Sequence, residues 1–481
     1  MNLTKRLALL ILLCFAPDIL LAEHMSAGGY SMSNHWVGLV SLSVFILALV
    51  AVSVEEFIEL RKSKPMLLAA GIIWGLIGWY SHQIVGGHHA EQALRHSLLQ
   101  YAELMLFILV VMTYINALTE RQVFLSLRTW VAHQRYSYRR MFWITGLAAF
   151  FLSPFLDNLS TALLMGAVVL NLERDNHRFV ALACVNVVLA CNAGGAYSPF
   201  GDITTLMVWQ QNIVSTTGRV DFFSFFNLFL PALISYLIPA VMMHFALPSG
   251  KLSLPQEQVR MSRGAKRIMG LFLLTIATAV VFQGQLGLPA TIGMMTGLSY
   301  LQFFGYYLKK THEPSNERVI TSETADFSVV VESRQPFDVF LRVARSEWDT
   351  LLFLGGVILC VSGLGYLGYL TIASEILYIQ LGATAANVTI GMASAVLENI
   401  PTMSVVLNMA PQMSLGQWLL ITLTAGIGGS LLSIGSAAGV ALMGQSNGKY
   451  TFFSHLRWTP AIMLGFFIGI QTHLWLNNTL F

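Results

Sequence analysis

The chain has 481 residues, of which 55% are hydrophobic and only 11% are charged, and its formal net charge is +3. This composition excludes an ordinary soluble domain and predicts an all-α polytopic membrane protein. No nucleic-acid-binding motif is present, so we expect no nucleic-acid partner.

The amino terminus has the pattern of a secretory signal peptide. Lys5 and Arg6 precede an apolar run from Leu7 to Phe15, and the small residue Ala22 follows. The alternative for residues 1–22 is an extra, uncleaved helix. With either interpretation, residue 23 emerges outside the cytoplasm.

Eight apolar runs have about the ~20 residues that a helix needs to cross a bilayer. They lie at 36–54, 66–86, 98–118, 225–247, 268–284, 289–308, 349–370 and 459–477. Cys14, Cys184, Cys191 and Cys360 all lie in apolar segments without metal-type spacing, so we interpret them as small buried hydrophobes. We expect no cofactor.

Residues 119–140 predict an interfacial amphipathic helix. Val123, Phe124, Leu127, Trp130 and Val131 recur at helical spacing opposite Arg121, Arg128 and Arg135. An ordinary solvated loop helix is the alternative. The stretch from Ile372 to Leu381 is a weaker counterpart. Near residue 60, the acids Glu55, Glu56 and Glu59 beside Arg61, Lys62 and Lys64 read as a solvated face at the membrane boundary.

Two acidic motifs stand in segments that are otherwise apolar. The first is Asp157-Asn158-Leu159-Ser160-Thr161, and the second is Glu398-Asn399-Ile400-Pro401-Thr402. Each is followed by a second shared pattern, Gly194-Gly195 to Gly201-Asp202 and Gly428-Gly429 to Gly435-Ser436. A duplicated polar motif at membrane depth indicates a transporter.

Each acid lies at the centre of a predicted re-entrant hairpin, the first at 141–172 and the second at 386–411. An arm of about 12 to 15 helical residues reaches roughly 18 to 23 Å, near the middle of the hydrocarbon layer. If the first hairpin enters from the cytoplasm and the second from outside, all 27 Lys and Arg residues except Arg95 and Arg219 fall in cytoplasmic segments. A single long span at 141–172 would instead turn the basic loops 247–267 and 309–348 outward.

Five crossings separate the hairpins, so the second half of the chain is upside down relative to the first. We therefore expect inverted structural repeats, each with three spans, a re-entrant hairpin, a discontinuous helix and a final span. The predicted parts are a scaffold at 23–118, a transport part at 141–247, a second scaffold at 268–370 with a cytoplasmic linker at 309–348, and a second transport part at 386–481.

The glycine patterns predict where the discontinuous helices, 179–210 and 414–443, are interrupted. The helix-break glycines are Gly194, Gly195, Gly201, Gly428, Gly429 and Gly435. Unwound backbone at membrane depth is tolerated only where it is buried in protein or lines a wet cavity. The breaks should therefore face the hairpin tips.

Asp157, Asp202 and Glu398 are the centre of the predicted ion site. One charge in the bilayer centre costs about 2.5 to 3.5 kcal/mol or more unless it is paired, protonated or hydrated. No intramembrane Lys or Arg lies near these acids in the sequence, so their expected partner is a transported cation or proton. The neighbouring oxygen donors suit a hard alkali cation; they are Asn158, Ser160, Thr161, Asn192, Ser198, Thr204, Thr205, Asn399, Thr402, Ser430, Ser433 and Ser436.

One site shared by a proton and a cation gives the simplest exchange mechanism, because a buried carboxylate favours its protonated form until a cation arrives. The alternative for the hydroxyls and amides is structural, since Asn, Ser and Thr also cap half-helices and bond between spans.

Three segments carry a resemblance to a known family: Ser153 to Leu163, Asn192 to Trp209, and Gly428 to Gly444. They are similar to the signature segments of NhaD-type sodium/proton antiporters, which belong to an ion-transporter superfamily that includes arsenite and dicarboxylate carriers. The resemblance covers most of the chain from about residue 36. Glu398 departs from it, because the family pattern leads us to expect Asp there.

The resemblance implies exchange of Na⁺ or Li⁺ for H⁺ across a bacterial inner membrane, with hairpins and broken helices moving together against a scaffold. In this sequence the moving part is 141–247 with 386–481. The transported Na⁺ is the only metal ion expected. The sequence leaves open a homodimer, the ion stoichiometry and whether Glu398 ligates the ion.

Two other functions compete with this expectation. An anion carrier is favoured by half-helix amino termini, but acids at both hairpin tips would repel a carboxylate substrate. A cation channel could use the same oxygens, and coupled proton movement would separate it from an antiporter. An intramembrane hydrolase is excluded by motif, so we expect no enzyme activity.

Overall fold

The computed structural model describes residues 32–55, 60–84, 88–132, 137–172, 176–250, 261–311 and 338–481. Within these ranges the fold is helical without strands, and seven helices are long and apolar enough to cross a membrane. The chain is therefore a multi-pass membrane protein. The predicted signal peptide or extra helix at 1–22 lies outside the described residues.

Three long helices come first in the described part of the chain. They are α2 (Trp36–Ser53), α4 (Ser63–Ile84) and α5 (His88–Glu120), followed by the short α6 (Val123–Ala132). All three predicted spans are confirmed as helices, but α5 starts at His88 rather than at residue 98. Its polar first turns continue the helix, with Glu91 and Arg95 forming an i,i+4 ion pair.

A hairpin and an interrupted helix follow in the first half. Their elements are α7 (Tyr138–Leu156), α8 (Asn158–Leu172), α9 (His177–Gly195), α10 (Ile203–Gln210), the 3₁₀ turn η1 (Phe223–Leu228) and α11 (Phe229–Ala246). Asp157 alone separates α7 from α8. The break between α9 and α10 contains Pro199 and Gly201, as predicted, but the predicted break glycines Gly194 and Gly195 belong to the last turn of α9.

The second half contains short helix pairs at the corresponding positions. Its elements are α12 (Ala265–Gly284), α13 (Ala290–Lys310), α14 (Val339–Ala344), α15 (Trp348–Tyr366), α16 (Tyr369–Ser374), η2 (Glu375–Gln380), α17 (Ala383–Leu397), α18 (Asn399–Met409), α19 (Leu415–Gly428), η3 (Ser433–Gly435), α20 (Ala437–Gln445), α21 (Phe452–Leu456), α22 (Thr459–Leu476) and η4 (Asn478–Leu480). The predicted hairpins and interrupted helices are thus present as helix pairs in both halves.

Equivalent glycines bring each interrupted helix against the first arm of its hairpin. A Cβ added at Gly194 would come within 2.3 Å of the Phe150 carbonyl oxygen, and one added at Gly428 within 1.9 Å of the Gly391 carbonyl oxygen. Phe150 and Gly391 each lie seven residues before the acid of their hairpin. Glycine is required at both contacts because backbone meets backbone.

Equivalent serines make the same contact. Ser153 donates a hydrogen bond to the Cys191 carbonyl over 2.7 Å, and Ser394 donates one to the Ala425 carbonyl over 3.0 Å. Each serine lies four residues before its acid. The two hairpins are therefore attached to the two interrupted helices in the same way.

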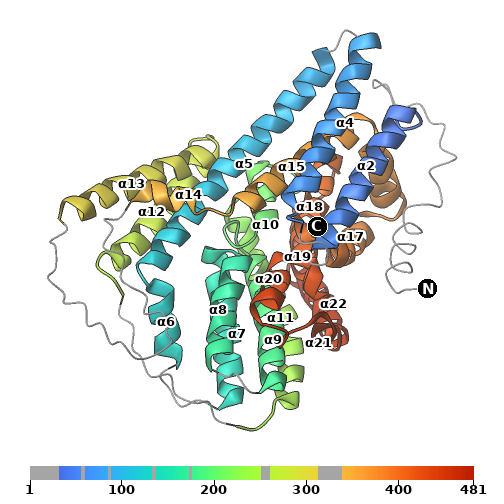
Figure 1. Ribbon diagram of the computed structural model, residues 1–481. Helices are drawn as coiled ribbons and strands as arrows, with labels where there is room; N and C mark the ends of the chain where they lie inside the picture. Colours follow the sequence, from blue (N-terminus) through green and yellow to red (C-terminus); the bar gives the residue numbers. More distant parts are fainter. Residues whose placement is uncertain are drawn as a thin grey trace.

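Figure 1 shows the arrangement of these elements. Helices α7, α8 and α9 pack side by side at one end of the molecule, and α2 and α4 rise at the other end. Helix α4 packs on α15, α12 packs on α13, and α11 packs on α22. The long α5 crosses the molecule and contacts both α13 and α15.

The structure also describes the predicted amphipathic segments and three of the four cysteines. The amphipathic segment 119–140 contains α6, which Gln122, at φ 58°, separates from α5. Its counterpart from Ile372 to Leu381 is helical as well, in α16 and η2. The interfacial position of both stays a prediction. Three cysteines, Cys184, Cys191 and Cys360, are buried and free as expected, and Cys14 lies outside the described residues.

Candidate functional site

The two hairpin tips have the same unusual backbone conformation. Asp157 has φ 62° and ψ 161°, and Glu398 has φ 64° and ψ 154°. Side-chain-bearing residues rarely occupy this region, which typically costs about 1 to 3 kcal/mol and persists where the surroundings impose it. The acids therefore occupy equivalent, strained corners where two half-helices meet.

The Asp157 carboxylate is held by the first turn of α8. It accepts a hydrogen bond from the Ser160 backbone N–H over 2.7 Å and another from Ser160 Oγ over 3.0 Å. This is the capping function that the structural alternative predicted. Among the described residues, no cationic side chain forms an ion pair with Asp157.

Asp202 is a buried acid, with only 3% of the residue exposed, whereas Asp157 is half-buried. It begins α10 as its N-cap, accepting from the Thr204 N–H over 3.4 Å. Asn399, from the tip of the other hairpin, donates to both Asp202 carboxylate oxygens over 3.3 and 3.0 Å. Asp202 likewise has no ion-pair partner within the described ranges.

Ser436 is the position equivalent to Asp202 in the second half. It is the N-cap of α20, and its backbone angles, φ −137° and ψ 145°, match the −146° and 142° of Asp202. The serine hydroxyl accepts from Gly439 N–H. The two breaks thus share a geometry, but only the first carries a carboxylate.

Asn192 connects the two halves at the centre of the site. Asn158 donates to Asn192 Oδ1 over 3.2 Å, and Asn192 Nδ2 donates to Ser430 Oγ over 2.7 Å and to Ser436 Oγ over 3.0 Å. All four residues are buried. This network fixes the first hairpin tip to both helix breaks.

Several predicted oxygen donors have no hydrogen-bond partner although they are buried. These hydroxyls belong to Thr161, Thr204, Thr205 and Ser433. An unsatisfied buried polar atom is costly, and hydroxyl oxygens suit a hard cation such as Na⁺. None of these four residues, however, lines the cavity beside Asp157 and Asp202.

The hydroxyls of two other predicted donors form hydrogen bonds with backbone carbonyls. Ser198 Oγ donates to the Pro154 carbonyl over 3.0 Å, and Thr402 Oγ1 donates to the Glu398 carbonyl over 2.7 Å. Both bonds hold backbone near the strained tips. The structural alternative therefore describes these two residues better than a ligand role.

A cavity of about 90 Å³ brings much of the predicted site together. The predicted residues that line it are Asp157, Asn158, Ser160, Asp202 and Asn399. Lys62, Arg345 and Glu347 line it too, and none of these was predicted as a site residue. The volume admits an ion with a few waters.

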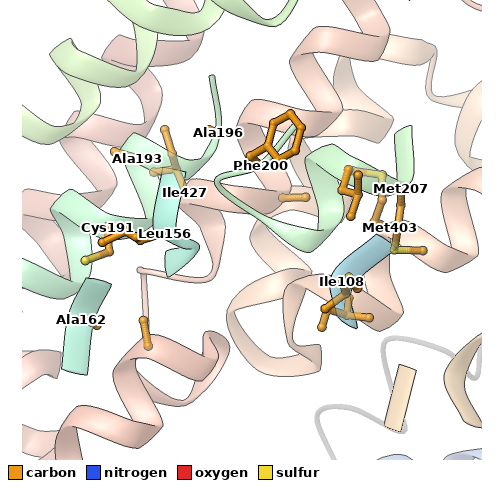
Figure 2. Packing of buried hydrophobic residues seen from close by; sticks show 14 of the residues in the cluster. Ile108, Leu156, Ala162, Cys191, Ala193, Ala196, Phe200, Met207, Met403 and Ile427 are labelled. Atoms are coloured by element: carbon orange, nitrogen blue, oxygen red, sulfur yellow. The ribbon is translucent and has the colours of Figure 1, made fainter. Parts of the chain in front are cut away.

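Apolar side chains surround the breaks and keep water from other directions. Figure 2 shows Phe200 in the first break, with Met207 of α10 and Met403 of α18 beside each other and near Ile108 of α5. All four are buried. An ion in the cavity is therefore bounded by a low-dielectric wall, in which electrostatic interactions are stronger than in water.

The expectation that Glu398 lacks a cationic partner was wrong. Lys62 Nζ lies 3.0 Å from Glu398 Oε1, with the two side chains 14% and 12% exposed. Lys62 does not belong to a solvated face, because the loop before α4 reaches the second hairpin tip. The contact spans 336 residues, which no local sequence pattern records.

Comparisons with known proteins match the chain over nearly its whole length. The model of the CitMHS family, described as citrate transporter, matches residues 32–426. The Na⁺/H⁺ antiporter NhaD of Vibrio cholerae is 52% identical over 99% of this chain and 100% of its own length. The antiporter NhaD of Alkalimonas amylolytica is 53% identical over 99% of this chain and 97% of its own. The chain belongs to the CitMHS family and to the NhaD antiporters.

A more distant relative, sodium/proton antiporter 1 of Arabidopsis thaliana, is 29% identical over 94% of this chain and 75% of its own length. The resemblance of the three signature segments to the NhaD family is therefore confirmed. Membership of a transporter family places this NhaD-family chain among membrane carriers and not among enzymes.

Proposed function

We propose that this protein is a secondary active antiporter that exports Na⁺, or Li⁺ in its place, in exchange for H⁺ across the bacterial inner membrane. The relatives from Vibrio cholerae and Alkalimonas amylolytica are Na⁺/H⁺ antiporters, which supports Na⁺ and H⁺ as the transported ions. The observation that carries the proposal is a pair of carboxylates, the half-buried Asp157 and the buried Asp202, which line one cavity and have no ion-pair partner among the described residues.

Each of these carboxylates requires a positive partner at membrane depth, and a proton or an alkali cation can serve. The protonated form is favoured while the site is empty, because burial disfavours the charged form. A bound Na⁺ favours the charged form and releases the proton. Competition for the same oxygens thus couples the two ions without a further device.

The candidate ligands are the Asp157 and Asp202 carboxylates with the buried hydroxyls that have no partner, those of Thr161, Thr204, Thr205 and Ser433. Asn158, Asn192, Asn399 and Ser436 position these groups through the network that joins both breaks. Ser160 holds Asp157 in place.

We assign the two halves to inverted repeats. The matching strained tips, the matching glycine contacts and the matching serine bonds support this architecture. The moving part is 141–247 with 386–481, and the scaffold is 23–118 with 268–370. Arg345 and Glu347 end the predicted cytoplasmic linker, so the cavity that they line opens toward the cytoplasm.

Citrate transport is the second candidate, because the CitMHS family carries that description and because Lys62 and Arg345 line the cavity. The argument against it is charge. Lys62 is already neutralised by Glu398, and the remaining carboxylates around the cavity repel a tricarboxylate.

Everted membrane vesicles test the proposal. An acid-interior pH gradient is established, and Na⁺, Li⁺, K⁺ and then citrate are added while the gradient is recorded. The gradient should collapse with Na⁺ and Li⁺, and D157N should reduce this response at least 100-fold, to the level of vesicles without the protein. Glu91 is an exposed acid far from the cavity, so E91Q serves as the control and should behave as wild type.

An unchanged Na⁺ response in D157N would remove Asp157 from the mechanism. Movement of labelled citrate without any cation response would assign the chain to the citrate carriers.

A further inference from the structure

A buried ion pair connects the loop before α4 to the tip of the second hairpin. Lys62 Nζ and Glu398 Oε1 are 3.0 Å apart, and both side chains are nearly covered. Of the ion pairs in the described part of the chain, this one joins the predicted scaffold to the predicted transport part. Removing one member would leave the other charge buried without compensation, so the two residues depend on each other.

The Lys62 side chain is held by α4 and α15. Its ammonium lies 4.7 Å from the centroid of the Phe353 ring, within the range of a cation–π interaction. The adjacent Ser63 donates a hydrogen bond to Asp349 in the first turn of α15. The place of the ammonium is thus set by α4 and α15, whereas the carboxylate belongs to the α17–α18 hairpin.

The motif itself explains why Glu398 needs this lysine and Asp157 does not. Ser160, three residues after Asp157, supplies a backbone N–H and a hydroxyl to the carboxylate. The equivalent residue after Glu398 is Pro401, which has neither group. The second tip therefore lacks both donors that satisfy the first carboxylate.

The length of the acidic side chain is the second difference between the two tips. Glu398 has one methylene more than aspartate, and its carboxylate points away from its own helix start to the ammonium of Lys62. The two departures from the first motif, Glu for Asp and Pro for Ser, thus have one structural result. The second carboxylate is satisfied by a lysine instead of by its own helix.

Three further acids face Lys62: Glu55, Glu347 and Asp349. Burial, the largest single effect, lowers the pKa of Lys62. The charge and hydrogen bond of Glu398, together with the charges of Glu55 and Asp349, outweigh burial and raise that pKa above the ordinary lysine value. Lys62 therefore stays charged at any pH at which the protein works. A permanent ammonium occupies the position that a transported cation would need at Glu398.

We propose that Lys62 is a tethered cation that fills the Glu398 half of the duplicated site, so that only the Asp157 and Asp202 half is open to Na⁺ and H⁺. Lys62 is then a positioning residue, because it acts through Glu398 and touches no transported ion. This inference rests on the proposed function. If Lys62 fills the Glu398 half, it limits the number of ions that the protein can carry in one cycle.

Purified protein in proteoliposomes tests the proposal with two readouts. The first is the KM for Na⁺ from Na⁺-driven proton flux, and the second is the H⁺/Na⁺ ratio from the Na⁺ gradient that balances a set pH gradient. E398Q should transport more slowly, because Lys62 loses its partner, but its KM for Na⁺ should stay within about twofold of wild type and its ratio should not change.

K62Q should change the H⁺/Na⁺ ratio, because the freed Glu398 then binds and releases a proton of its own in each cycle. The double variant K62Q/E398Q should return to the wild-type ratio and recover part of the rate. K64Q is the matched control, since Lys64 is an exposed neighbour, and it should match wild type in both readouts.

Loss of Na⁺ dependence in E398Q would make Glu398 an ion ligand and overturn the proposal. The same conclusion would follow if K62Q left the ratio as K64Q does. Where a single variant does not fold, the neutral pair K62Q/E398Q decides, because a wild-type KM is expected only if neither residue binds the ion. If the wild-type protein showed no Na⁺-coupled proton flux, the proposed function itself would be wrong. That result differs from the failures of the Lys62 proposal described above, which all require a wild-type protein that transports.

Discussion

Asn158 and Asn399 follow the two tip acids directly, yet they bind different partners. Asn158 bonds Asn192 within its own half, whereas Asn399 reaches across to Asp202 of the other half. The second motif therefore contributes to the first carboxylate site through its amide, while its own acid pairs with Lys62. The same position after each tip acid therefore has two different roles, because the asparagine binds a different partner in each half.

At the residue scale, Glu347 gives a pH-dependent prediction. The residue as a whole is exposed, but it lines the cavity, and the partial burial of its carboxyl there raises its pKa above the usual value. Above that raised pKa the group is negative and attracts Na⁺ to the cavity; as the pH falls through it, the group is protonated and the attraction is lost.

E347Q should therefore raise the KM for Na⁺ roughly two- to fivefold at alkaline pH, as one partly screened charge would. The difference from wild type should disappear at acidic pH, where Glu347 is neutral in both. The KM measured across the pH range in everted vesicles checks this. A difference that persists at acidic pH would contradict it.

At the scale of elements, the helix breaks depend on close backbone contact. Gly428 of α19 lies against α17 so closely that a Cβ would meet the Gly391 carbonyl oxygen at 1.9 Å and Ser394 Oγ at 2.7 Å. Neither neighbour can move without disturbing the strained tip at Glu398. The break is thus positioned by packing and not by glycine flexibility alone.

G428A should lower stability by about 1 to 3 kcal/mol or more, the usual range for overpacking, and reduce transport accordingly. G444A in the following helix is the matched control, because nothing lies within 4 Å of the added Cβ. Thermal unfolding of both purified variants makes the comparison. Equal melting temperatures would show that the contact is looser than the structure indicates.

The elements were largely predictable, and the contacts between them were only partly so. Hydropathy marked the spans, and the glycine patterns marked both breaks, because backbone conformation and membrane crossing follow local composition. Asp157, Asp202 and Asn399 were predicted as one site and line one cavity. Lys62 was not, since its role depends on a loop that tertiary structure brings to Glu398. The sequence does hold one signal for this contact: Pro401 stands in the second motif where the first has Ser160, so the second acid lacks the donors that hold the first.

At the scale of the molecule, the proposed inverted repeats require the starts of the two hairpins to lie on opposite sides of the membrane. Arg139 precedes the first tip and Leu381 precedes the second, and both are exposed. The described native cysteines are buried, which leaves a low labelling background.

In intact cells, a membrane-impermeant maleimide should label L381C and leave R139C unlabelled until the cells are opened. Labelling of both positions from the same side would contradict the inverted repeats. Wild-type protein provides the background.

Competition of Na⁺ and H⁺ for the Asp157 and Asp202 carboxylates is the central step of the proposed exchange. The most direct measurement is proton release from purified, weakly buffered protein when Na⁺ is added, recorded with the Na⁺ affinity at several pH values. We predict that Na⁺ binding releases protons, that the apparent affinity for Na⁺ weakens as the pH falls, and that D157N abolishes the release. Na⁺ binding without proton release, with an affinity independent of pH, would contradict the shared site.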